Sequence, residues 1–371
     1  MKIKILHVIA KRPTGGIGTF ILNMYENIDR NLIQFDCLIN ADIKEGEFDK
    51  KIKSLGGEIF ILPELKIKNI FKYLWNLKKF YEAHNDYKAI HVHTINIGVF
   101  NFIFARIYKI KNRIVHSHSI KYSDKFLNSV RNYMLCLPLK YISNIYFACS
   151  KKAGIFLFGQ NLMNKNKVKI IKNGINYKKF KFDMKTREEY RKKLKIKKDT
   201  LVIGHVGMFT KVKNQEFIIE IFKYLEECNK DLKLILIGNG ELKEKIENRI
   251  KYLDLEDKIL ILGNRNDVNN WMQCFDILLF PSLFEGIPLT LLEAQAAGLQ
   301  CFVSNTISNE VKVCNLINFI DLKLTAEQWG KYILKNYKKN YRPDTEEEFR
   351  KNGYEIENVA QELQKIYLSL N

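Results

Sequence analysis

Short apolar runs rich in β-branched residues recur along the chain, and most precede a segment with helical spacing of apolar residues. Residues 1–10 (MKIKILHVIA) form the first run, and apolar residues then recur at helical spacing from Phe20 to Ile28. Further strands are predicted at 33–39, 89–93, 113–117 and 146–150, with helices at 69–83 and 98–108. Strands separated by helices indicate a parallel sheet covered on both faces.

The same pattern restarts in the second half of the chain. Strands are predicted at 201–206, 232–237, 259–262, 277–280 and 300–303, and helices at 214–228, 241–253, 268–274 and 288–297. Asn173-Gly174-Ile175 and the charged stretch 178–200 lie between the two series, and residues 345–370 have the spacing of a long amphipathic helix. We therefore predict an α/β protein with two Rossmann-like, doubly wound domains, 1–172 and 173–344, that face a cleft.

Composition agrees with this division. The chain has 371 residues, of which 46% are hydrophobic, enough for two domains with separate cores, and this content excludes a largely disordered protein. No apolar stretch approaches the roughly 20 residues of a membrane span, and the first residues lack the pattern of a signal peptide. The seven cysteines are scattered and form no C-x-x-C pair, which argues against a disulfide framework or a structural zinc site. We expect a soluble protein of a reducing cytosol.

Positive charge is concentrated in the first half. Residues 1–170 contain 28 Lys and Arg against 12 Asp and Glu, whereas residues 171–371 contain 33 against 29. Between Tyr87 and Phe182 the only acidic residue is Asp124. Such a surface attracts phosphate-rich partners, among them anionic lipid headgroups, a pyrophosphate or nucleic acid.

The most informative segment is 280–293, FPSLFEGIPLTLLE. A strand ends at Phe280, and Pro288 stands where a first helical position is expected, so Glu285 and Gly286 fall in the loop before a helix and Glu293 falls inside it. Loop amides and the positive end of a helix make a site for a phosphate or pyrophosphate. A nearby carboxylate can accept hydrogen bonds from the hydroxyls of a ribose or of an attached sugar.

This segment resembles the donor-binding motif of retaining, nucleotide-sugar-dependent glycosyltransferases of the family-four type. The resemblance rests on Glu285 and Glu293 within P-S-x-x-E-G-x-P-x-x-x-x-E-A, and other motifs match in the same order along almost the whole chain. It implies the GT-B fold, with a C-terminal helix at 345–371 that crosses back to the N-terminal domain. It also implies transfer of a sugar, with retention of configuration, from a nucleotide-sugar, which we expect to be a UDP-sugar, in capsule or exopolysaccharide synthesis.

In the first domain, Gly15-Gly16 resembles the glycine loop of this family near the acceptor and the transferred sugar. The pairs His91/His93 and His116/His118 end two predicted strands, and alternation places both members of each pair on one face, so at most one of each is expected to reach the cleft. The resemblance implies that His118 lies near the sugar as a catalytic residue, together with Glu285. It places Gly16 on the donor side and Gly15 and His93 on the acceptor side.

In the second domain, the stretch from Gly204 to Asn214 resembles the G-R-F-x-x-x-K-N loop, whose Arg and Lys hold the donor pyrophosphate. Met208 occupies the Arg position, which removes a bidentate phosphate partner and leaves Lys213, beside Lys211, as the main cation. The resemblance further implies donor contacts from a set of loop residues in which Arg265 is a candidate substitute for the missing Arg: Gly207, Asn239, Arg265, Val268, Gly286 and Glu293.

No D-x-D sequence occurs, so a metal-bridged donor site has no support, and we expect neither a metal nor a cofactor. The charge of the leaving pyrophosphate is then neutralised by Lys213, the Gly286 amide and the helix dipole. The resemblance implies front-face attack by the acceptor hydroxyl, with the departing phosphate taking the proton.

The resemblance also gives the basic first half a role. In this fold the first domain carries the acceptor, which in many bacterial relatives is a saccharide on a polyprenyl pyrophosphate at the inner membrane face. Lys and Arg beside aromatic residues, in 68–79 (Phe71, Tyr73, Trp75) and 106–131, are candidates for contact with an anionic membrane. We therefore expect a cytoplasmic protein with peripheral membrane contact.

Two other functions are compatible with parts of this sequence. A nucleotide-sugar epimerase shares the architecture and the pyrophosphate site, and would interconvert UDP-sugars without an acceptor. A basic nucleic-acid-binding protein requires stacking aromatics along one groove and has no need of the loop from Glu285 to Glu293; we find no recognised nucleic-acid module.

Overall fold

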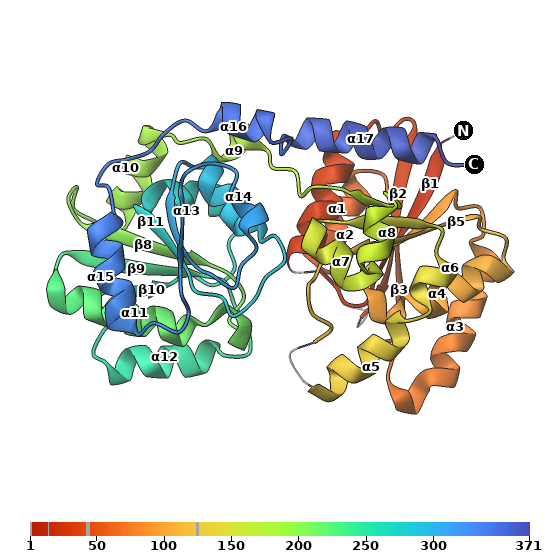
Figure 1. The fold of residues 1–371 in the computed structure, drawn as a ribbon, viewed down its shortest axis with the longest axis horizontal. Helices are drawn as coiled ribbons and strands as arrows, with labels where there is room; N and C mark the ends of the chain where they lie inside the picture. The colour runs from red at the N-terminus through yellow and green to blue at the C-terminus, as the bar shows by residue number, and fades with distance from the viewer. Residues whose placement is uncertain (1, 14, 42–44, 124–125) are drawn as a thin grey trace. The chain divides into compact units, whose positions relative to one another are not determined.

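The computed structural model describes residues 2–13, 15–41, 45–123 and 126–371, and it confirms the two-part α/β architecture (Figure 1). Unit 1 comprises residues 1–174 and 353–371, and unit 2 comprises residues 175–352. Asp124 and Met1 lie outside the described residues. Among the helices of those residues, none has the length and apolar character needed to cross a membrane.

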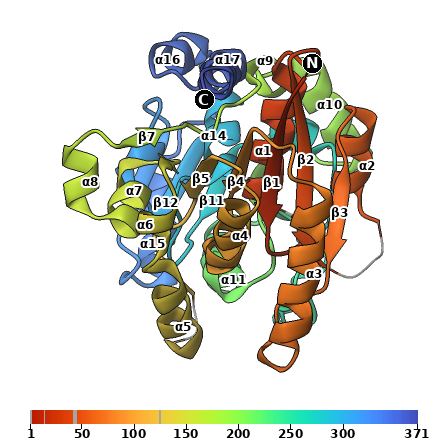
Figure 2. The same cartoon turned by 90° about the vertical axis from the view of Figure 1, so that its right-hand side faces the viewer.

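Unit 1 is built on a seven-stranded parallel sheet in the order β3-β2-β1-β4-β5-β6-β7, and Figure 2 shows β4, β1, β2 and β3 side by side in this order. The strands are β1 (Ile3–Ile9), β2 (Ile33–Asn40), β3 (Ile59–Leu62), β4 (Ala89–Val92), β5 (Asn112–Ser117), β6 (Ile145–Ala148) and β7 (Val168–Ile170). The central strands are buried on both faces, which explains why they read as continuous apolar runs in the sequence.

Helices cover both faces of this sheet. Apolar residues of α1 (Gly16–Asn27), α2 (Glu47–Ser54) and α17 (Ile356–Leu368) join one hydrophobic core, and those of α3 (Ile70–Ala83), α4 (Ile95–Ile107), α6 (Leu139–Ile142) and α7 (Lys151–Phe158) join the other. Unit 1 also contains α5 (Phe126–Cys136) and α8 (Gln160–Asn164).

Unit 2 repeats the arrangement with a six-stranded parallel sheet in the order β10-β9-β8-β11-β12-β13. Its strands are β8 (Leu201–Val206), β9 (Leu232–Ile237), β10 (Ile259–Ile261), β11 (Ile277–Phe280), β12 (Gln300–Ser304) and β13 (Ile317–Ile320). Its helices are α9 (Tyr177–Phe180), α10 (Met184–Lys193), α11 (Gln215–Cys228), α12 (Lys243–Tyr252), α13 (Val268–Cys274), α14 (Leu289–Ala296), α15 (Ala326–Asn336) and α16 (Glu346–Lys351).

The C-terminal segment expected as one helix is divided between the units. Helix α16 stays with unit 2, where the Thr345 hydroxyl donates to the Gln295 carbonyl at 2.9 Å and the ring of Phe349 packs on that of Tyr177. Helix α17 then packs on α1 of unit 1, as the fold class predicts. Gly174 permits this packing, because a Cβ there would lie 2.9 Å from the Ile356 side chain.

In both sheets the strand order reverses direction beside the first strand, between β1 and β4 in unit 1 and between β8 and β11 in unit 2. Open parallel sheets bind ligands at the carboxyl ends of the strands that flank such a point. The loops after β1, β4, β8 and β11 are therefore where the fold itself directs attention.

Candidate functional site

In unit 2, the loop after β11 leads into α14. Pro288 has an extended backbone and is the N-cap residue of α14, whereas it was expected as the first helical residue. The helix therefore begins one residue later, at Leu289. Glu285 and Gly286 lie in the loop before this helix, as the sequence predicts. Among the described residues no side chain caps the helix, and the start of such a helix can bind an anion.

Lys213 and Glu285 form an ion pair. The Lys213 Nζ lies 2.6 Å from the Glu285 Oε1, and the two side chains are 16% and 17% exposed. The same ammonium lies 4.5 Å from the centre of the Phe280 ring. The cation that the resemblance assigns to the pyrophosphate and the carboxylate that it assigns to the sugar are thus neighbours in unit 2.

Glu293 lies on α14 without a hydrogen-bond or ion-pair partner for its carboxylate among the described residues. Some of the residue reaches solvent, yet protein surrounds the carboxyl closely, and desolvation raises its pKa to about 7, slightly opposed by the charge of Lys179. A carboxyl poised between its two protonation states is ready to accept hydrogen bonds from hydroxyl groups, which would favour its charged form.

Backbone hydrogen bonds join the loops after β8, β9 and β10. The Gly238 amide donates to the Gly263 carbonyl at 2.8 Å, and the Phe209 amide donates to the Asn239 carbonyl at 3.0 Å. Gly238 has φ +142°, and a Cβ there would lie 2.0 Å from the Gly207 carbonyl oxygen. These three loops form one continuous rim beside Lys213.

His205, which was not predicted from the sequence, lies in β8, the strand that leads into the first of these loops. It is fully buried, and its Nδ1 lies 2.9 Å from the Leu279 carbonyl oxygen. Desolvation lowers its pKa to about 4, so it is neutral beside Lys213. The available signal was its position in β8, directly before the G-x-x-x-x-x-K-N stretch.

The sequence departs from the family motif at Met208, and Arg265 is the candidate substitute for the missing Arg. Met208 is 45% exposed, so the position leaves room for a longer side chain. Arg265 is bound bidentately to Asp267, with 2.8 Å between Nε and Oδ1 and 2.9 Å between Nη2 and Oδ2, and this pairing lowers the Asp267 pKa to about 2. Asn239 is exposed, and Val268 is the first residue of α13. The idea that Arg265 replaces the missing Arg stays a prediction, and a phosphate would have to compete with Asp267 for it.

In unit 1, histidines from three adjacent strands meet on one face of the sheet. His93 Nδ1 lies 2.9 Å from His118 Nε2, and His93 Nε2 lies 2.8 Å from His7 Nδ1. His91 links to His116 at 3.2 Å and to the Tyr367 hydroxyl at 2.6 Å. His118 is partly exposed, whereas the other four histidines are at most 3% exposed. Within each expected pair, therefore, the first histidine is interior. His93, expected on the acceptor side, is also buried, and its ring contacts the partly exposed His118.

The sequence reading missed His7 as a member of this cluster. The register places His7 directly opposite His91 on the neighbouring strand, and the sequence contained the signal, since five of its seven histidines lie in or directly after three apolar runs. Desolvation is the main cause that lowers the pKa of each of these five histidines, and it brings the pKa of His7 and of His118 to about 3. All five rings are therefore neutral near pH 7.

Two triads of this cluster, His7/His91/His93 and His93/His116/His118, have ring nitrogens within 4.8 Å of one another, a spacing that a metal ion could bridge. In the described part of the chain, however, the pKa values of these imidazoles are shifted by burial and by one another, and by no carboxylate. Neutral imidazole is the form in which histidine binds a metal, so these pKa values do not decide between a hydrogen-bonded cluster and a metal site. Metal independence stays a prediction.

Gly15 and Gly16 begin α1 after the loop that follows β1. Gly15 is the N-cap, and among the described residues α1 has no side-chain cap and a Cβ on Gly15 would meet no atom within 4 Å. The first turn of α1 thus has open space beside Gly15. The roles assigned to Gly15, Gly16, His93 and His118 stay predictions.

Comparisons with known proteins agree on one family. The family model described as "Glycosyl transferases group 1" matches residues 186–356. The chain is 31% identical to the putative glycosyltransferase EpsF of Bacillus subtilis over 89% of this chain and 86% of EpsF. It is 28% identical to an Escherichia coli UDP-Gal:alpha-D-GlcNAc-diphosphoundecaprenol alpha-1,3-galactosyltransferase, over 85% of this chain and 82% of that enzyme.

The fold is also that of solved structures. Anabaena HepE, crystallised in complex with UDP and glucose, superposes with a TM-score of 0.80 over 99% of this chain and 100% of HepE, at 16% sequence identity. WaaG, a glycosyltransferase involved in lipopolysaccharide biosynthesis, superposes with a TM-score of 0.71 over 98% of this chain and all of WaaG, at 15% identity. At these identities the likeness establishes the two-domain fold.

Proposed function

Since the chain belongs to the group 1 glycosyl transferases, we propose that it transfers a sugar from a nucleotide-sugar donor, a UDP-sugar, to a saccharide or to a saccharide linked to a polyprenyl pyrophosphate, in the synthesis of a surface polysaccharide. The E. coli relative is named for a UDP-galactose donor and a diphosphoundecaprenol acceptor, and HepE was crystallised with UDP and glucose. The observation that carries the proposal is the pairing of Lys213 with Glu285 beside the uncapped start of α14.

Each group has a distinct part in this proposal. Lys213, the Gly286 amide and the positive end of α14 hold the pyrophosphate, so Lys213 exchanges its partner from Glu285 to phosphate when the donor binds. Glu285, released from the ion pair, accepts hydrogen bonds from the sugar hydroxyls. Glu293, with its pKa of about 7, accepts hydrogen bonds from the ribose hydroxyls and becomes fully charged in doing so.

The reaction we propose retains configuration and requires no metal. The acceptor hydroxyl attacks from the face that the leaving group departs, and the departing phosphate takes the hydroxyl proton, so that no covalent enzyme intermediate forms. Lys213 and the helix amides stabilise the charge that develops on the phosphate. His118 hydrogen-bonds the sugar, and its ring is held in place by His93 behind it.

A screen of nucleotide-sugars by thermal shift, followed by mass spectrometry of products, tests this function. A bound donor raises the melting temperature in proportion to the logarithm of its excess over Kd. We expect stabilisation by UDP and one UDP-sugar, transfer to a saccharide acceptor with retained configuration, and unchanged turnover in EDTA. Interconversion of UDP-sugars without an acceptor would instead show an epimerase, and loss of turnover in EDTA would refute metal independence.

We also propose that unit 1 contacts an anionic membrane through α3 and α5. Phe71 and Trp75 on α3 are 86% and 54% exposed, and Phe126 and Leu127 on α5 are 80% and 82% exposed. Both helices project from the same side of unit 1 (Figure 2). Tyr73, expected as part of this surface, is instead buried at 1% exposure and belongs to the core.

Charge accompanies the exposed rings. The Lys79 Nζ lies 3.7 Å from the centre of the Trp75 ring, an arrangement in which a ring enters the headgroup region while the ammonium meets phosphate. The variant Phe71→Ser/Trp75→Ser should lower binding to phosphatidylglycerol vesicles at low salt, while Tyr252→Ser, at an exposed ring of unit 2, should not. If the α3 variant and the Tyr252→Ser variant bind these vesicles equally well, α3 has no role in membrane contact.

A further inference from the structure

A cavity in unit 2 lies at the amino ends of the sheet strands, away from the loops that carry Lys213 and Glu285. Its volume is about 820 Å³, within the range of small-molecule sites. It is lined by α10, by residues 195–198 before β8, by Asp276 before β11 and by residues 337–342 after α15. These segments meet at the amino ends of β8 and β11, whereas Lys213 and Glu285 follow their carboxyl ends.

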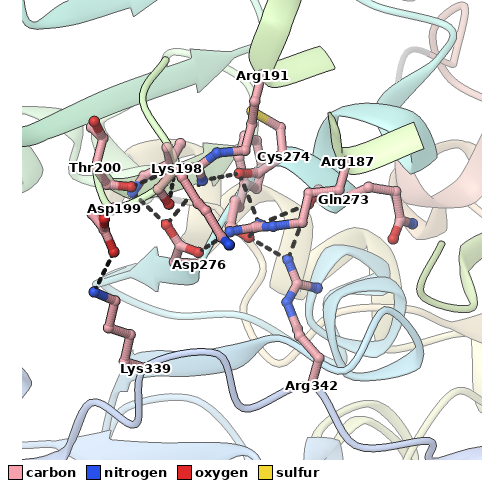
Figure 3. A network of polar contacts seen from close by, with 12 residues as sticks. Arg187, Arg191, Lys198, Asp199, Thr200, Gln273, Cys274, Asp276, Lys339 and Arg342 are labelled. Atoms are coloured by element: carbon pink, nitrogen blue, oxygen red, sulfur yellow. Dashed lines mark hydrogen bonds and ion pairs between the residues drawn. The ribbon is translucent and has the colours of Figure 1, made fainter. Parts of the chain in front are cut away.

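The floor of this cavity is a cluster of three arginines around one carboxylate (Figure 3). Arg187 Nη2 lies 2.5 Å from the Asp276 Oδ1, and Arg191 Nη1 lies 3.2 Å from the Oδ2. Arg342 donates to the carbonyls of Ala297, Met272, Gln273 and Phe275. Both of the other arginines also donate to carbonyls at the end of α13, among them Cys274.

The end of α13 accounts for the arginines in the floor. The last carbonyls of a helix have no partner within the helix and form its negative pole, and the arginines satisfy those of α13. Three guanidinium groups nevertheless face a single carboxylate, so the floor keeps an excess of positive charge. Because most of the nitrogens are already engaged, this excess acts on the cavity as a fixed potential.

The mouth of the cavity adds flexible positive charge. Lys192, Lys195, Lys198 and Lys338 line it, all are exposed, and none forms an ion pair within the described chain. In all, seven Lys and Arg line the cavity against two acids, Glu188 and Asp276. Such a set of unpaired ammonium groups suits an anion with more than one charge.

Between the floor and the mouth, the walls are apolar. Phe182, Ile196, Tyr337 and Tyr341 line the cavity, with Ile196 only 8% exposed and Tyr341 43% exposed. Arg342 lies 4.8 Å from the centre of the Phe182 ring, and Lys338 lies 5.2 Å from that of Tyr341, so the cations stand at the edge of apolar surface. Inorganic phosphate alone would leave these walls uncovered.

We propose that this cavity binds a phosphate ester with an apolar body, whose phosphate meets the lysines of the mouth and whose body covers Phe182, Ile196 and Tyr341. The site is separate from the one assigned to the sugar donor, and it holds whether or not the chain transfers a sugar. An isoprenoid phosphate and a nucleoside monophosphate share the required chemistry, because each joins a doubly charged head to an apolar or aromatic body.

Calorimetric titration tests this proposal with four ligands: geranyl phosphate, AMP, inorganic phosphate and geraniol. Lys195→Ala/Lys198→Ala removes two charges from the mouth without touching the buried arginines, and Lys223→Ala/Lys251→Ala removes two exposed charges of α11 and α12 as a matched control. Tyr341→Ala shortens the wall, with Tyr252→Ala as its control.

At least one ester should bind about tenfold more tightly than either phosphate or geraniol, with an affinity that falls as salt rises. The mouth variant and Tyr341→Ala should each weaken that ester about tenfold at an unchanged melting temperature, and the two controls should not. Tighter binding of geranyl phosphate identifies an isoprenoid body, and tighter binding of AMP a nucleoside. Ester binding no tighter than that of inorganic phosphate, or an equal loss in the mouth variant and its control, overturns the proposal.

Discussion

Glu293→Gln should make the stability of the protein less sensitive to pH. Burial raises the pKa of the Glu293 carboxyl from 4.5 to about 7 in the folded state, so the unfolded chain loses this proton at lower pH than the folded chain does. The carboxyl therefore costs nothing below its unfolded pKa and costs most above pH 7, where it must be charged in the fold. Each pH unit between the two values is worth about 1.4 kcal/mol, so from pH 5.5 to pH 8 the penalty grows by about 2 kcal/mol.

The assay compares urea unfolding of the wild type and of Glu293→Gln at pH 5.5 and at pH 8. The variant should gain about 2 kcal/mol relative to the wild type between the two pH values, because Gln cannot ionise. Glu244→Gln, at an exposed position of α12, should show no such gain. A difference between wild type and Glu293→Gln that is the same at both pH values would refute the argument from desolvation.

Three further substitutions test the surroundings of the sites. Met208→Arg, at a 45% exposed position, should tighten UDP binding about tenfold by supplying a bidentate phosphate partner; unchanged affinity by calorimetry would show that the position does not face the pyrophosphate. Gly238→Ala should lower the free energy of unfolding in urea by more than about 2 kcal/mol, because the added Cβ would overlap the Gly207 carbonyl and the backbone there has φ +142°. Gly263→Ala is the control, since a Cβ at Gly263 meets no described atom within 4 Å, and an equal loss in the two variants would contradict the prediction. Asp276→Asn should lower the free energy of unfolding by about 3–5 kcal/mol, because two nearly buried arginines lose their carboxylate, and a loss below about 1 kcal/mol would show that the α13 carbonyls alone suffice.

The sequence predicted the two α/β units and the long strands because these are continuous apolar runs between turn residues. It missed β3, β7 and β13, which are edge strands with partly exposed positions, although it found β4, β6, β10 and β11, which are equally short. The division of the C-terminal segment also escaped it. Phe349 and Tyr367 belong to one amphipathic pattern, yet the first packs on unit 2 and the second on unit 1, and only the tertiary contacts distinguish them.

At the site, the sequence placed Glu285, Gly286 and Glu293 correctly around the start of α14, because a proline before an apolar helix marks such a start. It could not show that Lys213 pairs with Glu285, since the pairing depends on how two loops 72 residues apart meet. Nor could it show the cavity floored by Arg187 and Arg342, because that site joins segments whose separate residues look like ordinary solvated charges.

The measurement that bears most directly on the central claim is calorimetric titration of UDP into the wild type, Lys213→Ala and Lys211→Ala. Lys211 is exposed and lies two residues away, so its loss removes the same charge without removing the partner of Glu285. We expect UDP to bind the wild type, Lys213→Ala to weaken binding at least tenfold and Lys211→Ala to change it little. Equal affinities for all three proteins, or no binding of UDP to the wild type, would contradict the central claim.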